Sequence, residues 1–382
     1  MCYSDPVSPL SPRPRLSLFK RIGLGMMLAG LLLAGLELGT RAFLGPTAPV
    51  PVYSGSEVSD RWLEAKGDTV HVISQASEMV DVQFPTQPTA PRVAVLGGSS
   101  VHGGSHLNAN DEFPGLIQKS TGIRTLNLGK PANDSHDVVK ILEDLLKWPM
   151  AGVVVYTGHN DFGNLFFNDR FGTVQQGRQA RLQATLERFQ LFNVLKRTLK
   201  PEVNGTQNVL ADPSQSDTNL LAIGTERRTT ALRYYQINLE RMAWLCQRAD
   251  VPLILVTPVG NINAPPVSRD CVFEPCAAQL HQEAVALFGT DRTRALSLLS
   301  QARDVDPIPL RAPTPAVDAV RAMGAHPGVT VVDAVAKLPG DERVDAPARW
   351  LFKDPVHFSA EGHLEMANLI APIVREVLNS ER

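Results

Sequence analysis

The chain has 382 residues, of which 43% are hydrophobic and 20% charged, and its formal net charge is −2. This composition is that of a globular protein, not of a disordered one. The balanced charge, without a basic patch interleaved with aromatic residues, argues against a nucleic-acid-binding protein. Because a single core stops growing at about 250–300 residues, we expect one main domain with insertions or a tail.

A membrane-spanning helix is predicted near the N-terminus. An apolar run covers residues 22–36, and its continuation to residue 44 makes the stretch long enough to cross a bilayer. Glu37 and Arg41 are one helical turn apart, so they can pair or snorkel at the interface. Four basic residues precede the run, at Arg13, Arg15, Lys20 and Arg21.

This charge distribution predicts that residues 1–21 stay cytoplasmic and that everything after the helix lies outside, in the periplasm or at the cell surface. A cleaved signal peptide is the alternative, since fifteen apolar residues also suit its hydrophobic region. We find no convincing Ala-x-Ala cleavage site after the run.

An alternating α/β pattern follows. Residues 45–90 are rich in proline, serine and polar residues and are interpreted as a linker with a few irregular elements. Within 91–380 we expect strands at 92–96, 124–128, 152–156, 253–257 and 329–333, and helices at 109–120, 134–146, 229–249 and 360–378. Right-handed crossovers between such strands give a parallel sheet in a three-layer α/β/α arrangement.

Two insertions interrupt the pattern, at 164–225 and 260–325. The first includes an expected helix at 178–198. The second contains the pattern of one tetratricopeptide-type helix pair at 281–302, which cannot form a solenoid alone and must pack on the body. This pair could shape a substrate cleft or hold a protein partner. Cys271 and Cys276, close together in a proline-flanked loop, could form a disulfide in an oxidising compartment.

Three short motifs carry the candidate chemistry, each at the end of a predicted strand or on a loop. Ser99 follows strand 92–96 at the start of a predicted helix, where backbone N–H groups favour a developing anion. Asn160 follows strand 152–156 and would project its amide from the loop. Asp354 precedes His357 by three residues, so it can hold one ring nitrogen while the other takes the serine proton.

These residue types supply a nucleophile, an oxyanion donor and a base with its orienting carboxylate, which are the catalytic groups of a serine hydrolase. No cofactor is required. Four histidines fall at the same predicted edge of the sheet, at His102, His106, His136 and His159. They lack a recognisable metal-ligand spacing, so we expect no metal site. Asp161 is interpreted as a loop-stabilising residue.

The motifs together resemble the SGNH (GDSL-like) hydrolase family. Gly97-Gly98-Ser99 stands where the family has Gly-Asp-Ser, and Gly103 matches its glycine four positions after the serine. Gly158-His159-Asn160-Asp161 and Asp354-Pro355-Val356-His357 match two further blocks. The spacing to Gly103 favours Ser99 over Ser100 as the nucleophile.

The resemblance implies a flavodoxin-like sheet, a triad of Ser99, His357 and Asp354, and an oxyanion hole. The donors of that hole would be the backbone N–H groups of Ser99 and Ala132 and the side chain of Asn160. Two positions depart from the family pattern: Ala132 stands where it usually has glycine, and Gly98 where it usually has aspartate. The stretch Tyr156–Asp161 is similar to that of a membrane-anchored bacterial subgroup.

Three functions stay open at this point. The first is an esterase that cleaves an acyl ester of a carbohydrate or lipid outside the cytoplasm through an acyl-enzyme on Ser99. The second is an acyltransferase that passes an acetyl group to a cell-surface glycan with the same triad. The third is a non-catalytic binding module built on the same scaffold.

Overall fold

The computed structural model describes residues 18–44, 62–73, 79–81, 83–103, 107, 110–167, 186, 189–192, 195, 224–338, 340 and 349–380. The chain divides into two units. One unit holds residues 1–47 together with 189–200, and the other holds the rest of the chain.

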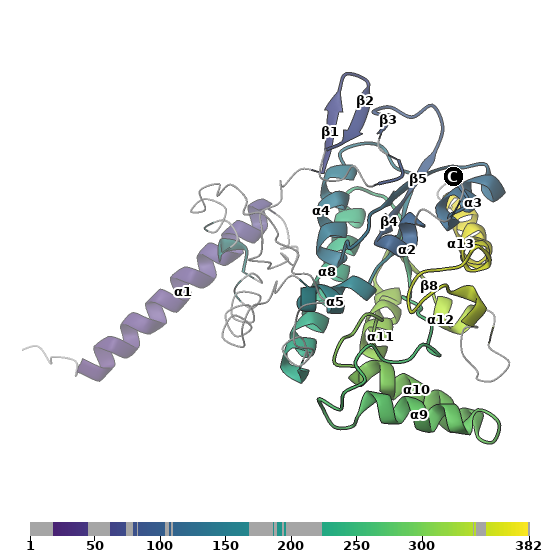
Figure 1. Ribbon diagram of the computed structural model, residues 1–382. Coiled ribbons are helices and arrows are strands. Elements are labelled where there is room, and N and C mark those ends of the chain that lie inside the picture. The colour runs from purple at the N-terminus through teal and green to yellow at the C-terminus, as the bar shows by residue number, and fades with distance from the viewer. Residues whose placement is uncertain are drawn as a thin grey trace, which may run out of the picture. The chain divides into compact units, whose positions relative to one another are not determined.

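The larger unit is built on a parallel sheet of five strands in the order β5-β4-β6-β7-β8 (Figure 1). The strands are β4 (Arg92–Gly97), β5 (Arg124–Gly129), β6 (Gly152–Tyr156), β7 (Leu253–Val256) and β8 (Val329–Val332). Each neighbouring pair is parallel. This confirms the predicted fold class.

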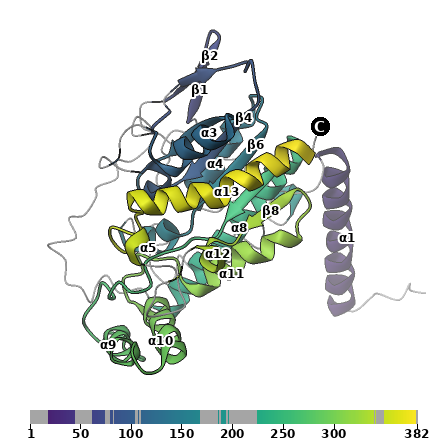
Figure 2. The ribbon, with the colours of Figure 1, turned by 90° about the vertical axis from the view of Figure 1, so that its right-hand side faces the viewer.

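Helices cover both faces of the sheet, because successive strand residues point to opposite sides. Ala94 and Leu96 pack in a core with α4 (Ser135–Leu145), α8 (Thr225–Arg248) and α11 (Thr314–Ala322). Val93 and Val95 pack in a second core with α3 (Phe113–Thr121) and α13 (Ala360–Ser380). Both faces are therefore buried, which explains the continuous apolar runs of the strands. Figure 2 shows α13 crossing one face.

The strand order determines where a site can form. The first strand, β4, lies inside the sheet, with β5 on one side and β6 on the other. The chain therefore changes direction across the sheet between β4 and β6, and ligands bind outside the carboxyl ends of strands at such a point. Two short helices begin at this edge, α2 (Ser99–His102) after β4 and α5 (His159–Phe167) after β6.

Part of the stretch expected to be a linker forms a second sheet instead. Strands β1 (Leu63–Lys66), β2 (Thr69–Val72) and β3 (Gln83–Pro85) are antiparallel. Val70 and Phe84 are buried in the same core as α4. Asp144 of α4 accepts hydrogen bonds from the backbone N–H groups of residues 62 and 63, at 2.6 and 3.2 Å. The body therefore begins by residue 62.

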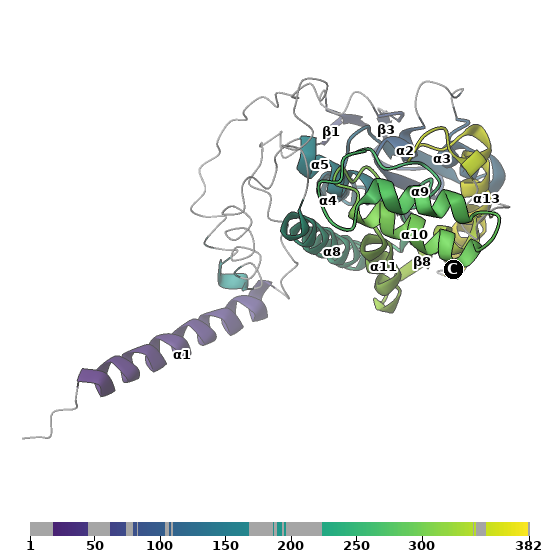
Figure 3. The same cartoon turned by 60° about the horizontal axis from the view of Figure 1, so that its bottom comes forward.

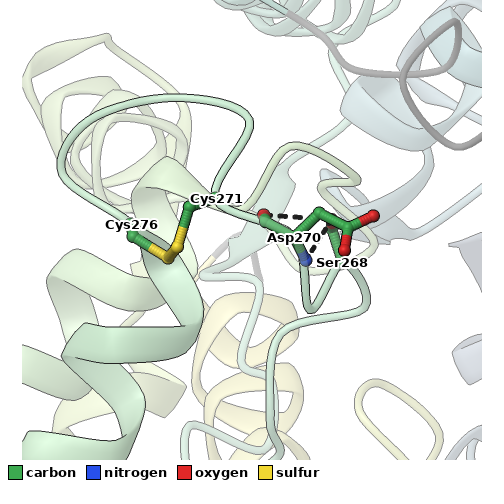
Figure 4. The surroundings of a disulfide bond; sticks show 4 residues. All are labelled: Ser268, Asp270, Cys271 and Cys276. Carbon is green, nitrogen blue, oxygen red and sulfur yellow. Dashed lines mark hydrogen bonds between the residues drawn. A yellow bond between two sulfur atoms is a disulfide. The ribbon is translucent and has the colours of Figure 1, made fainter.

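The second insertion contains two antiparallel helices, α9 (Ala277–Leu287) and α10 (Arg292–Val305), where the helix pair is expected (Figure 3). Their shared core contains Ala284, Ala295 and Leu299, and Ile262 of the preceding loop packs into it. Cys271 and Cys276 form a disulfide in the loop that leads into α9 (Figure 4). Most of the helix expected at 178–198 lies outside the described residues.

The smaller unit contains α1 (Leu18–Leu44), one uninterrupted helix that includes the predicted membrane span. Its segment Gly25–Phe43 has a mean hydropathy of 1.4, and none of it is buried within the protein. Length and composition allow this helix to cross a membrane, and a signal sequence has the same properties.

Candidate active site

Ser99 lies at the carboxyl end of β4, where α2 begins. The turn that carries it requires glycine at position 98. A Cβ atom there would lie 2.6 Å from Asn160 Nδ2 and 3.1 Å from the carbonyl oxygen of Asn133. Gly98 therefore lets the turn after β4 approach the loop after β5 and the start of α5.

His357 and Asp354 reach the site on the loop before α13. A β-bridge between Phe352 and Phe358 closes this loop at its base. Asp354 Oδ1 accepts hydrogen bonds from the backbone N–H groups of Val356 and His357, at 2.9 and 2.8 Å. The motif is thus a short turn folded around its own carboxylate, as the three-residue spacing predicts.

The structure brings Ser99, His357 and Asp354 into one hydrogen-bonded chain. His357 Nε2 lies 2.7 Å from Ser99 Oγ, and His357 Nδ1 lies 2.6 Å from Asp354 Oδ2. Burial raises the pKa of the Asp354 carboxyl, but hydrogen bonds from the His357 ring and from two backbone N–H groups outweigh it and lower the pKa to about 2. The carboxylate is therefore ionised at neutral pH and holds the ring with a proton on Nδ1, leaving Nε2 to accept.

Ser100 has a different role in the structure. It is buried, and its hydroxyl donates to the carbonyl oxygen of Val356 at 3.0 Å. This bond connects the serine turn to the histidine loop. Ser100 therefore holds the two loops together while its neighbour faces His357.

Ala132, one of the remaining predicted oxyanion donors, lies on the loop after β5. Asn160, the other, lies in the first turn of α5 and not on a loop as expected. Asn160 Nδ2 donates one hydrogen to the carbonyl oxygen of Asn133 at 2.7 Å, which fixes the amide beside Gly98. An amide NH₂ group carries two hydrogens, so Asn160 Nδ2 keeps a second one with which it can donate to another acceptor. Ser99 and Asn160 line the same small cavity, together with Asn133 and Thr157.

Ala132 adopts a left-handed conformation with a φ of 63°. The family that the sequence resembles usually has glycine at this position. Alanine is strained in this conformation, because its Cβ atom approaches the following carbonyl group. We expect Ala132→Gly to increase the free energy of unfolding by up to about 1 kcal/mol, because relief of strain exceeds the added entropy of the unfolded chain. Urea unfolding measures this change.

The same variant keeps the backbone N–H group at position 132, so kcat should be preserved. Ala286, exposed on α9 in ordinary helical conformation, is the matched control. There the change to glycine should cost about 1 kcal/mol. Equal destabilisation at both positions would contradict strain at Ala132.

His159 connects the second insertion to the site, a role that the sequence did not reveal. It is buried, and its Nδ1 accepts a hydrogen bond from the backbone N–H of Ala312 at 3.0 Å. Its Nε2 lies 3.0 Å from the Tyr156 hydroxyl and 3.2 Å from the carbonyl oxygen of Val259. Burial lowers the pKa of His159 to about 3, so the ring is neutral and structural rather than a second base.

Asp161 also has a structural role. Its buried carboxylate accepts hydrogen bonds from the backbone N–H and the hydroxyl of Ser135, at the start of α4. Burial and the nearby Asp134 carboxylate raise the pKa of Asp161. Asn164, one turn further along α5, donates to the carbonyl oxygen of Ala132 at 3.1 Å. These contacts hold α5 against the start of α4 and the loop after β5.

The second insertion borders the site on the side of Asp354. The backbone N–H of Asn261 donates to the carbonyl oxygen of Pro355 at 2.9 Å. A groove of about 610 Å³ runs from Asp354 and Pro355 to Val285 and Phe288 on or next to α9.

Within the described part of the chain, no three His, Cys, Asp or Glu side chains gather where they could hold a metal ion.

In comparisons with known proteins, no protein-family model matches the chain, and no curated protein matches it. Similar solved structures include a GDSL-like lipase from Bacteroides thetaiotaomicron (15% identity, TM-score 0.36, covering 75% of this chain and 88% of that one). A member of the lipolytic protein G-D-S-L family from Veillonella parvula is also similar (11% identity, TM-score 0.36, covering 74% and 98%).

An acetyl xylan esterase is similar at 13% identity, with a TM-score of 0.36 and coverage of 74% and 99%.

Proposed function

We propose that the protein is a serine esterase that cleaves an acyl ester of a carbohydrate or lipid through an acyl-enzyme on Ser99. The observation that carries this proposal is the hydrogen-bonded chain from Ser99 Oγ through His357 to Asp354, at the carboxyl end of β4. A hydroxyl at this distance from an imidazole is in reach of a general base, and the carboxylate fixes the ring.

The reaction follows from these positions. His357 Nε2 takes the proton of Ser99 as Oγ bonds to the ester carbonyl carbon, and the carbonyl electrons move onto its oxygen. The donors proposed for that oxyanion are the backbone N–H groups of Ser99 and Ala132 and the Asn160 amide. Collapse breaks the bond to the alcohol, which leaves with the proton from His357. Water then attacks the acyl-enzyme by the same steps and releases the acid.

The role of Asn160 can be measured. Removing one oxyanion donor typically lowers kcat by about 10²–10³-fold. We expect Asn160→Ala to lower kcat in this range and to change KM little, because the oxyanion forms only in the transition state. Asn164→Ala is the comparison, since Asn164 contacts the loop and not the cavity at Ser99. Equal kcat losses in the two variants would contradict a donor role for Asn160.

A panel of acetyl, longer-chain and glycan esters tests the reaction itself. Hydrolysis and transfer differ in whether water or a sugar hydroxyl reaches the acyl-enzyme. Release of free acid that is unchanged by added glycan supports the esterase. Acyl transfer to the glycan in place of acid release would assign the same triad to an acyltransferase. Turnover of no ester, by a protein that also forms no adduct with an acylating probe, would favour a binding module.

We further propose that α1 anchors the protein in a membrane, with the catalytic unit outside the cytoplasm. Lys20 and Arg21 immediately before the apolar run favour a cytoplasmic N-terminus. The Cys271–Cys276 disulfide fits an oxidising compartment.

A fusion experiment tests this topology. A reporter enzyme that folds only outside the cytoplasm, joined after Arg382, should be active, and the protein should resist extraction from the membrane by salt. Release of a shortened soluble protein would show that the segment is a cleaved signal peptide. An inactive reporter would reverse the orientation.

A further inference from the structure

Glu37 is the one acidic residue of α1, and its carboxylate is held by a segment distant in sequence. Glu37 Oε1 accepts a hydrogen bond from the backbone N–H of Gln190 at 2.8 Å, and Oε2 accepts one from Leu191 at 2.9 Å. Arg41 Nε lies 2.7 Å from Oε1. The Glu37 side chain is only 13% exposed. Figure 3 shows this short segment, in teal, beside the end of α1.

From these contacts we propose that residues 189–192 and 195 belong to a second membrane-contacting element, which docks on α1 at Glu37 and lies in the outer interface of the bilayer. This inference rests on the membrane anchorage proposed above. Residues 189–200 belong to the same compact unit as α1. The segment therefore accompanies the anchor and not the catalytic unit.

The depth of Glu37 supports this placement. The apolar run that begins at Ile22 rises about 22 Å before it reaches Glu37, at 1.5 Å per residue. The hydrocarbon core of a bilayer is about 30 Å thick. If Ile22 marks the inner boundary, Glu37 lies about 8 Å inside the outer one, where an ionised group requires partners. Arg41 and the two backbone N–H groups are those partners.

The exposed side chains of the segment fit a lipid surface. Phe189 is 48% exposed and Leu195 49% exposed, whereas the residues between them that the structure describes are partly buried. In sequence, Lys196 and Arg197 follow directly. Apolar side chains beside basic ones are the composition of a helix that lies at a membrane interface near anionic headgroups. Because Glu37 accepts hydrogen bonds from the backbone N–H groups of Gln190 and Leu191, these donors are satisfied in a region poor in water.

The test uses the full-length protein in native membranes, with a photo-crosslinking amino acid placed at one position at a time. Phe189 and Leu195 are the test positions. Leu31, 62% exposed on α1, reports the anchor, and Leu364, 48% exposed on α13, is the control on the catalytic unit. We expect lipid adducts at residues 31, 189 and 195, several-fold above those at residue 364.

A second variant tests the attachment. Glu37→Leu makes α1 more apolar and removes the acceptor for the two backbone N–H groups. Lipid adducts at residues 189 and 195 should then fall, while those at residue 31 stay unchanged.

Four results would overturn the inference. Adducts at residue 31 but not at 189 and 195 would leave the anchor standing and remove the second element. Adducts to a protein at 189 and 195 would make the segment a protein-binding surface. Adducts unaffected by Glu37→Leu would remove the role of Glu37. Absence of adducts at residue 31 would instead refute the proposed anchor, and the inference with it.

Discussion

Ser99→Ala should abolish ester turnover, with a loss in kcat on the order of 10⁶-fold, because nothing else in the triad can form the acyl-enzyme. The fold should be unaffected. Among the described residues, the Ser99 side chain forms a hydrogen bond only with His357. The rate is measured with the preferred ester of the panel, and far-ultraviolet circular dichroism with urea unfolding reports the fold.

Ser100→Ala is the matched control at the neighbouring position. It removes the hydrogen bond to the carbonyl oxygen of Val356, so it should lower stability by about 1 kcal/mol and leave most of the activity. Loss of activity at Ser100 as severe as at Ser99, or none at Ser99, would contradict the assignment of the nucleophile.

His357→Ala should lower kcat by at least about 10²–10⁴-fold, because a positioned general base typically contributes that much. Asp354→Ala should cost less, since it leaves the base in place and removes only its orientation. Ser99 and His357 act as a unit, so the double variant should be no slower than the slower single variant.

The order of these effects is the informative result. A larger loss for Asp354→Ala than for His357→Ala would indicate that the carboxylate does more than orient the ring. Additive losses in the double variant of Ser99 and His357 would contradict a shared proton-transfer step.

The core of the fold was predictable from the sequence because each buried strand is a short apolar run bounded by turn residues. Strands β4 to β8 each agree with the expected range to within a residue or two at either end. The positions of Ser99 and Asn160 followed from the ends of those runs, and that of the Asp354–His357 turn from its place shortly before the last helix. The structure brings Ser99, His357 and Asp354 together, and their catalytic roles stay predictions until the variants are measured.

Other features could not be predicted, because the residues that form them are polar, short or far apart. The β1–β3 sheet has isolated apolar residues among polar ones, so residues 62–85 resemble a linker. His159 looks like a pocket residue until Ala312, 153 positions later, is seen to donate to it. Glu37 looks like a poorly placed charge until its contacts with Gln190 and Leu191 are known. No local pattern encodes such pairs.

The most direct test of the central claim is labelling of the intact protein with a fluorophosphonate, followed by mass spectrometry of the labelled peptide. A serine activated by a hydrogen-bonded imidazole attacks phosphorus, so we expect one adduct, on Ser99, that is lost in His357→Ala and retained in Ser100→Ala. An adduct on Ser100, or a folded protein that forms none at all, would contradict it.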